Sequence, residues 1–126
     1  MRTKFTYTGI RVKDLEKSVD FYAKVLGMKE NGRSKIEQTK GETVTFTTDE
    51  GGPVLELNYY GKGSKFNTEY LVGEGVDHLA FQVDDLDKFA EEAKKAGYPL
   101  VLDMKTGSSR WVYIQDPNGI FIELFA

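Results

Sequence analysis

Hydrophobic and polar positions follow two periodicities in the first half of the chain, one typical of strands and one typical of a helix. Residues 6–12 are rich in β-branched and aromatic side chains, which predicts a strand. Apolar residues then recur at helical spacing over residues 15–26. Asp14, just before them, is suited to cap this helix, and Gly27, just after them, is suited to end it.

The rest of the first half is predicted to form strands. One strand is expected near residues 29–37. A β-hairpin is expected from residues 43–48 and 54–59, because residues 49–52 between them have the composition of a turn. The first half therefore has the predicted order βαβββ.

The second half repeats this order of elements. Apolar periodicity predicts a helix that begins after Asp85 and ends at Gly97. The strands are expected at residues 76–83, near residues 99–103, and in a hairpin of residues 110–115 and 120–125. The chain therefore reads as two βαβββ modules in a pseudo-twofold repeat, which belongs to the α+β class.

The length of the chain favours one domain that contains both modules. The sequence has 126 residues, close to the commonest size of a single domain. We expect module one at about residues 1–60, a Gly-rich linker at about residues 61–74 and module two at about residues 75–126.

Composition excludes several classes of function. The chain has no cysteine, which removes disulfides, thiolate metal sites and cysteine nucleophiles. It has one histidine, which excludes an iron site with two histidines from a single chain. The net charge of −3, with both signs mixed, argues against nucleic acid as a partner. No apolar run approaches a membrane span, and the N-terminus has no apolar signal core, so we expect a cytoplasmic protein without membrane partners.

Strand alternation places special polar residues at corresponding positions of the two modules. Each module has one on its first strand and a glutamate on its last, which pairs Tyr7 with Glu56 and His78 with Glu123. A single glutamate in a strand usually faces solvent, and a single histidine is usually a hydrogen-bonded part of the core. The repeated placement instead favours a site, since a divalent cation would satisfy the carboxylates and the imidazole. Oxygen and nitrogen ligands suit zinc, nickel, cobalt, manganese or iron(II).

Several stretches resemble glyoxalase I-like proteins of the vicinal oxygen chelate (glyoxalase/bleomycin-resistance) superfamily. They lie at residues 10–22 with 26–28, 54–57, 77–81 and 116–124, so the resemblance covers nearly the whole chain. It implies that the two modules form an open eight-stranded barrel-like sheet around a divalent metal, with zinc or nickel favoured and cobalt, manganese or iron as alternatives. It also implies a homodimer whose sites combine modules from two chains.

The same resemblance assigns roles to residues of this chain. Glu56, His78 and Glu123 fall on three metal-ligand positions. Tyr7 falls on the fourth, where glyoxalases have His or Gln, and it would bind as a phenolate, donate to a metal-bound water or close that side of the site. Arg11 matches an arginine that binds a carboxylate of glutathione.

Two further positions match substrate contacts less closely. Lys105 matches another glutathione contact, and Asn58 lies near, but not at, the usual spacing of an asparagine that contacts glutathione. The thiol of the substrate is therefore left open.

The resemblance implies a lactoylglutathione lyase-like enzyme that acts on a small molecule. It would convert a hemithioacetal to a 2-hydroxyacyl thioester by proton transfer through a metal-bound enediolate. Glu123 would be the base, since apolar neighbours raise a carboxyl pKa, and Glu56 would return the proton to the next carbon.

The alternative is a metal-free small-molecule binding protein of the bleomycin-resistance type. Its ligand would stack in an aromatic pocket. The candidate residues for that pocket are Tyr7, Tyr59, Tyr60, Phe66 and Trp111.

Overall fold

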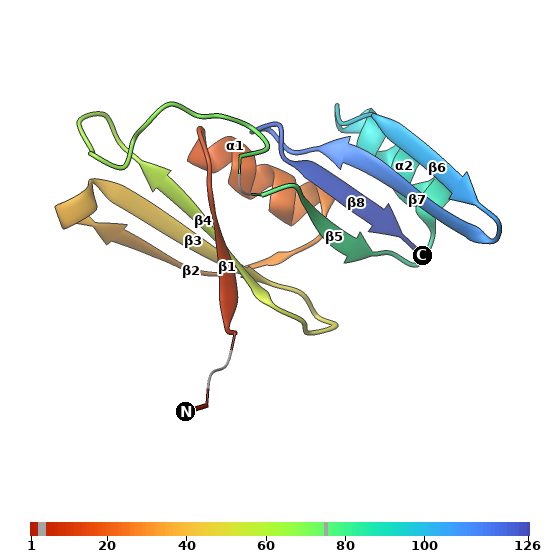
Figure 1. Cartoon of the computed structure of the whole chain (residues 1–126), viewed down its shortest axis with the longest axis horizontal. Coiled ribbons are helices and arrows are strands. Elements are labelled where there is room, and N and C mark those ends of the chain that lie inside the picture. Colours follow the sequence, from red (N-terminus) through yellow and green to blue (C-terminus); the bar gives the residue numbers. More distant parts are fainter. Residues whose placement is uncertain (3–4, 75) are drawn as a thin grey trace. The chain divides into compact units, whose positions relative to one another are not determined.

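Two four-stranded sheets, each accompanied by a helix, make up the chain (Figure 1). The computed structural model describes residues 1–2, 5–74 and 76–126. These residues fall into a first unit, Met1–Tyr70, and a second unit, Leu71–Ala126. Residue 75, at which module two was expected to begin, lies outside the described residues.

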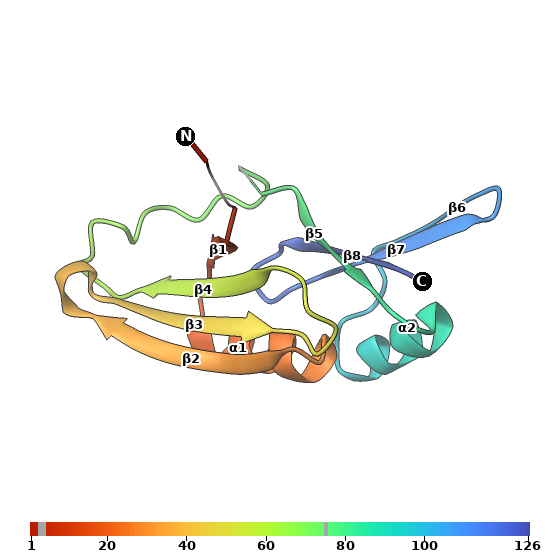
Figure 2. The same cartoon turned by 90° about the horizontal axis from the view of Figure 1, so that it is seen from below.

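The first unit has the predicted order βαβββ. Its strands are β1 (Tyr7–Arg11), β2 (Lys29–Ile36), β3 (Gly41–Thr47) and β4 (Val54–Tyr60). Its helices are α1 (Leu15–Asp20), a π-helical turn η1 (Phe21–Val25) and a short 3₁₀ turn η2 (Glu37–Thr39). The strand order in the sheet is β1-β4-β3-β2, with β1 parallel to β4, and α1 lies against one face of this sheet (Figure 2).

The second unit repeats this topology. Its elements are β5 (His78–Gln82), α2 (Leu86–Lys95), β6 (Leu102–Thr106), β7 (Ser109–Gln115) and β8 (Phe121–Phe125). The strand order is β5-β8-β7-β6, with β5 parallel to β8. The predicted α+β class and the two βαβββ modules are therefore confirmed.

Strand register confirms the internal repeat residue by residue. In the first unit Gly9 lies opposite Glu56, and in the second unit Ala80 lies opposite Glu123. His78 lies opposite Phe121 in the same way that Tyr7 lies opposite Val54, two positions before the glutamate. The two glutamates thus occupy equivalent places in equivalent sheets.

Alternation along the last strand of each unit separates the core from the other face. In β8, Ile122 and Leu124 are fully buried, while Phe121 and Phe125 are exposed and Glu123 is partly buried. Side chains alternate along a strand, so Glu123 lies on the face opposite the core.

Both predicted helix starts are confirmed. The side chain of Asp14 accepts a hydrogen bond from the Lys17 backbone N–H at 3.1 Å, and Asp85 accepts one from Lys88 at 3.0 Å. Each cap satisfies a backbone donor that the first helical turn leaves without an internal partner. The predicted glycine stop of the first helix is also present, since Gly27 has a φ of 67°.

Two elements differ from the sequence prediction. The first helix is α-helical only to Asp20 and then widens into the π-turn, where the adjacent aromatic residues Phe21 and Tyr22 are both buried. The strand expected near residues 99–103 runs instead from Leu102 to Thr106. All residues of β6 are exposed, so its first and last residues are determined by hydrogen bonding to β7 and not by a buried face.

A buried turn fixes how β7 and β8 pair. One carboxylate oxygen of Asp116 accepts from the backbone N–H of Asn118 at 2.8 Å and from that of Ile120 at 2.9 Å. The resulting register places Tyr113 opposite Glu123.

No helix in the described ranges is long and apolar enough to cross a membrane.

Candidate functional site

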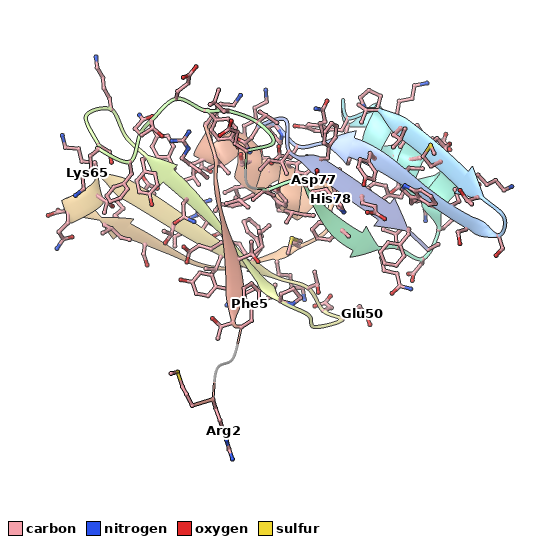
Figure 3. The ribbon with its side chains drawn as sticks, in the orientation of Figure 1. Arg2, Phe5, Glu50, Lys65, Asp77 and His78 are labelled. Atoms are coloured by element: carbon pink, nitrogen blue, oxygen red, sulfur yellow. The ribbon has the colours of Figure 1, made fainter. Side chains whose placement is uncertain are left out.

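The second unit brings His78 and Glu123 together. The parallel register of β5 and β8 sets the two residues on adjacent strands, and the imidazole Nε2 lies 3.0 Å from a carboxylate oxygen of Glu123. The other ring nitrogen, Nδ1, lies 2.7 Å from a carboxylate oxygen of Asp77, which directly precedes β5. Figure 3 labels Asp77 and His78 at the start of this strand. The imidazole is thus held between two carboxylates.

A neutral imidazole can donate a hydrogen bond to only one of these two carboxylates. A neutral ring has one N–H, so it donates to one carboxylate and presents a lone pair to the other. Whichever nitrogen carries the proton, the other contact, at 2.7 Å or 3.0 Å, brings two lone pairs together, which repel unless a second proton or a cation lies between them. With the proton on Nδ1, the Nε2 lone pair is available to a cation beside Glu123.

The separation of these two atoms fits two ligands of one metal ion. Ligand atoms about 2.1 Å from a common zinc ion lie roughly 3.0–3.4 Å apart at angles of about 90–109°. The observed distance is 3.0 Å. Within the part of the chain that the structure describes, no three His, Asp or Glu residues gather around one point. His78 and Glu123 are two donors, and the third predicted ligand, Glu56, belongs to the first unit.

Tyr113 borders this pair. Its hydroxyl makes a long hydrogen bond of 3.5 Å to Glu123, and its ring centre lies 5.5 Å from that of His78. Burial raises the pKa of Tyr113, and the negative charges of Glu123 and Asp77 raise it further. Tyr113 therefore stays protonated and donates to the Glu123 carboxylate.

The first unit holds the equivalent pair, Tyr7 and Glu56, in a more open arrangement. Glu56 is partly buried opposite Gly9, and Tyr7 is 50% exposed at the start of β1. Among the described residues, the two side chains share no hydrogen bond. Asn58 lies on β4, two positions after Glu56, and a side chain at Gly9 would begin 3.0 Å from its amide nitrogen. Glycine at position 9 thus leaves room for Asn58.

Arg11 is engaged by the chain itself. Its guanidinium donates to the backbone oxygens of Phe66 at 3.1 Å and Glu69 at 2.9 Å and to the hydroxyl of Thr68 at 2.9 Å. It also lies over the ring of Tyr70, 5.0 Å from the ring centre. Arginine has five N–H donors, so donor capacity remains for a ligand.

A cavity of about 160 Å³ adjoins Arg11 in the first unit. Its aromatic lining comes from Tyr59, Tyr60 and Tyr70, and the ring of Phe66 packs 5.3 Å from that of Tyr60. Trp111 lies elsewhere, on β7 in the second unit. The structure thus brings together Tyr59, Tyr60 and Phe66 from the aromatic residues proposed to bind a ligand without a metal.

Lys105 lies on the exposed strand β6, opposite Arg110 in β7. It belongs to the second unit, whereas Arg11 and Asn58 belong to the first.

Sequence reasoning missed Asp77 and Tyr113. The position of Tyr113 could have been predicted from strand alternation. Its neighbours Val112 and Ile114 are buried, so Tyr113 lies on the other face of the sheet, with Glu123. Asp77 lies just before its strand, where alternation gives no information about side-chain direction. Its contact with the imidazole depends on loop conformation.

The fold and these residues define a class: a two-module α+β protein with an imidazole–carboxylate pair on one sheet and an equivalent glutamate on the other. Residues 4–124 match the Glyoxalase/Bleomycin resistance protein/Dioxygenase superfamily. The chain belongs to this superfamily.

Relatives narrow the class to an enzyme. The chain is 34% identical, over 96% of its length and 88% of the other's, to a Vibrio parahaemolyticus protein named probable lactoylglutathione lyase. It is 33% identical, over 95% of its length and 88% of the other's, to the lactoylglutathione lyase of Neisseria meningitidis serogroup B. The chain is therefore a lactoylglutathione lyase-like enzyme, which favours the enzyme over the metal-free alternative.

The solved structures agree. The trypanothione-dependent glyoxalase I of Leishmania major superposes with a TM-score of 0.78 at 27% identity, covering 98% of this chain and 86% of that one. A glyoxylase/bleomycin resistance protein/dioxygenase domain from Frankia, at 21% identity, covers 99% of this chain and 98% of that one with a TM-score of 0.77 and shares the fold.

Proposed function

We propose that this enzyme isomerises a hemithioacetal to a 2-hydroxyacyl thioester with the help of a divalent metal ion. The observation that carries the proposal is the His78–Glu123 pair, whose Nε2 and carboxylate oxygen lie 3.0 Å apart, a separation that suits two ligands of one metal ion. The relatives named lactoylglutathione lyase support the same reaction class.

His78, Glu123 and Glu56 would hold the metal, with Tyr7 at or beside the fourth position. This donor set of nitrogen and oxygen atoms suits zinc or nickel first, and also cobalt, manganese or iron(II). When bound, the ion would polarise the carbonyl oxygen of the substrate. The proposal includes a homodimer whose sites draw one module from each chain, so that Glu56 of one chain would join His78 and Glu123 of the other.

Glu123 would act as the base. It removes the proton from the substrate carbon that bears both the hydroxyl and the sulfur, that electron pair forms a new carbon–carbon double bond, and the π electrons of the ketone move to its oxygen. Phe121 and Phe125 flank it on the same face of the strand. The Tyr113 hydroxyl, at 3.5 Å, helps to orient the carboxylate.

Glu56, in its protonated form, would complete the isomerisation by giving a proton to the neighbouring carbon. The hydroxyl proton of the first carbon passes to the former ketone oxygen, so the first carbon becomes the thioester carbonyl and the second carries the hydroxyl group. The proton held by Glu123 then returns to Glu56 through solvent, which restores both carboxyl groups. Substrate and product are isomers, so the reaction needs no oxidant or reductant.

The polar end of the thiol would lie near Arg11 and Asn58, with Lys105 as a further contact. Arg11 keeps donors for a carboxylate beyond those it gives to residues 66–69. The names of the relatives indicate two thiols, glutathione and trypanothione. Assays with hemithioacetals of several thiols will identify the thiol used here.

Metal analysis tests the site. The purified protein should bind one equivalent of a transition metal per chain, and His78→Ala should lose most of it. Gln82→Ala is the matched control, because Gln82 lies on the same strand and face as His78 and is exposed. Unchanged metal content in the His78 variant would refute the site.

Replacement of Glu123 tests the chemistry. Glu123→Gln keeps the size of the side chain and removes its basicity, so turnover of a hemithioacetal should fall by at least about a hundredfold. The thioester product absorbs in the ultraviolet, which gives a direct rate. A near-normal rate would exclude Glu123 as the base.

A further inference from the structure

The single histidine has a second carboxylate neighbour that the proposed reaction does not use. Asp77 lies 2.7 Å from His78 Nδ1, a shorter distance than the 3.0 Å between Nε2 and Glu123. The Asp77 side chain is 89% exposed, so it lies on the solvent side of the ring and away from the core. We propose that Asp77 is a positioning residue that holds the His78 proton on Nδ1, so that the Nε2 lone pair faces Glu123 and the metal.

Asp77 and Glu123 compete for the single proton of a neutral imidazole. A neutral imidazole carries its N–H on either nitrogen, and the hydrogen bond made at one nitrogen decides which tautomer forms. Without Asp77, the proton would go to Nε2 and form a charge-assisted hydrogen bond to Glu123. In that tautomer, His78 Nε2 and Glu123 would be hydrogen-bonded to each other, and neither would be available to a metal ion. Asp77 prevents this by offering a carboxylate acceptor at Nδ1.

The other groups that face the ring do not offer this function. Tyr113 contacts the imidazole with its ring, at 5.5 Å between centres, and its hydroxyl donates to Glu123. Glu123 lies at the opposite nitrogen. Among the described residues, Asp77 is therefore the acceptor that the structure provides at Nδ1. Carboxylates that accept from a ligating histidine are a recurrent way to orient metal ligands.

The tautomer is directly measurable because the chain has one histidine. A ¹⁵N–¹H spectrum of the metal-free protein contains the signals of one imidazole only. It is recorded at a pH where the ¹⁵N chemical shifts show that the ring is neutral. The wild type should carry its proton on Nδ1. In Asp77→Ala the proton should move largely to Nε2, while Asp77→Asn, whose amide oxygen also accepts, should retain the wild-type tautomer.

Asp84→Ala is the matched control. Asp84 is an exposed aspartate just after the same strand, so the variant loses the same charge without touching the ring. Its tautomer should equal that of the wild type. A wild-type proton on Nε2, or an unchanged tautomer in Asp77→Ala, would overturn the positioning role.

The second measurement is zinc affinity, and this step rests on the proposed metal site. Zinc should bind to Asp77→Ala about ten- to a hundredfold more weakly than to the wild type in a competition titration with a chromogenic chelator. Asp77→Asn should recover most of that loss, and Asp84→Ala should show none. Equal affinities for Asp77→Ala and the wild type would contradict the role of Asp77 in metal binding.

The two hypotheses fail in different ways. If His78→Ala binds zinc as the wild type does, the metal site is wrong, and the effect of Asp77 on the tautomer is judged by the spectrum alone. If His78→Ala loses zinc but Asp77→Ala changes neither tautomer nor affinity, the metal site stands and the role of Asp77 is wrong.

Discussion

The side chain of Arg110, on β7, links this strand to β6 and to α2 in the second unit. Its Nε and Nη2 donate to the two carboxylate oxygens of Asp103 on β6, each at 3.0 Å, and its Nη1 donates to Asp87 in the first turn of α2 at 2.7 Å. The hydrogen bonds from Arg110 hold the pKa of Asp103 below its ordinary value of 3.8. The pair therefore favours the folded state only while Asp103 is ionised.

This pair should make part of the stability depend on pH. The folded-state pKa of Asp103 is lowered, so its contribution is present above the ordinary value of 3.8 and is lost as pH falls through the lower folded value. Asp103→Asn should be less stable than the wild type at about pH 5, and the gap should narrow at about pH 3. Thermal unfolding followed by circular dichroism at both pH values measures the gap.

Asp84→Asn provides the control for that series, since Asp84 is an exposed aspartate outside the strands and helices. Its gap from the wild type should stay small at both pH values. A gap for Asp103→Asn that is the same at both pH values would show that its carboxylate does not couple to folding.

At the residue scale, alternation alone was enough to predict part of the site. It placed Glu123 opposite the core, and the repeat aligned it with Glu56. Contacts that depend on loop conformation could not be predicted from the sequence pattern. Asp77 lies before its strand, and Arg11 is held by residues 66–69, which no periodicity describes.

At the element scale, the connection between β7 and β8 differs from its counterpart in the first unit. Asp116 is 4% exposed and holds two backbone N–H groups, whereas Asp49 forms an exposed ion pair of 2.7 Å with Lys29. The buried turn sets the register that places Tyr113 beside Glu123. The corresponding aspartate in the first unit lacks this burial.

Replacement of each aspartate should show this difference. Asp116→Ala leaves buried backbone donors without an acceptor, so the free energy of unfolding should fall by about 2–3 kcal/mol. Asp49→Ala removes a surface ion pair, which is worth about 0–1 kcal/mol. Urea unfolding of both variants measures the free energies, and equal losses would show that burial of the turn does not matter.

Local signals predicted elements well where a buried face or a cap defined them. Asp14 and Asp85 marked the helix starts, and β4 and β8 were recognisable because apolar residues alternate along them. The exposed strand β6 lacks such a face, so its limits were shifted. The π-turn at Phe21–Val25 was missed because its apolar spacing also fits an α-helix.

At the scale of the whole molecule, the size of the units bears on how the chain folds. Met1–Tyr70 and Leu71–Ala126 are each smaller than about 80 residues, a range in which one hydrophobic core rarely supplies more than about 3–5 kcal/mol. The prediction from the sequence that the chain is one domain implies that it unfolds in one cooperative step.

The lone tryptophan makes this cooperativity testable. Trp111 lies in the second unit, so its fluorescence reports only that unit, while far-ultraviolet circular dichroism reports the strands of both. The two signals should give the same midpoint in urea for the wild type. They should shift together in Asp116→Ala, because a loss in the second unit is shared by the whole domain. If the units unfold independently, fluorescence will shift alone and part of the dichroism signal will keep its wild-type midpoint.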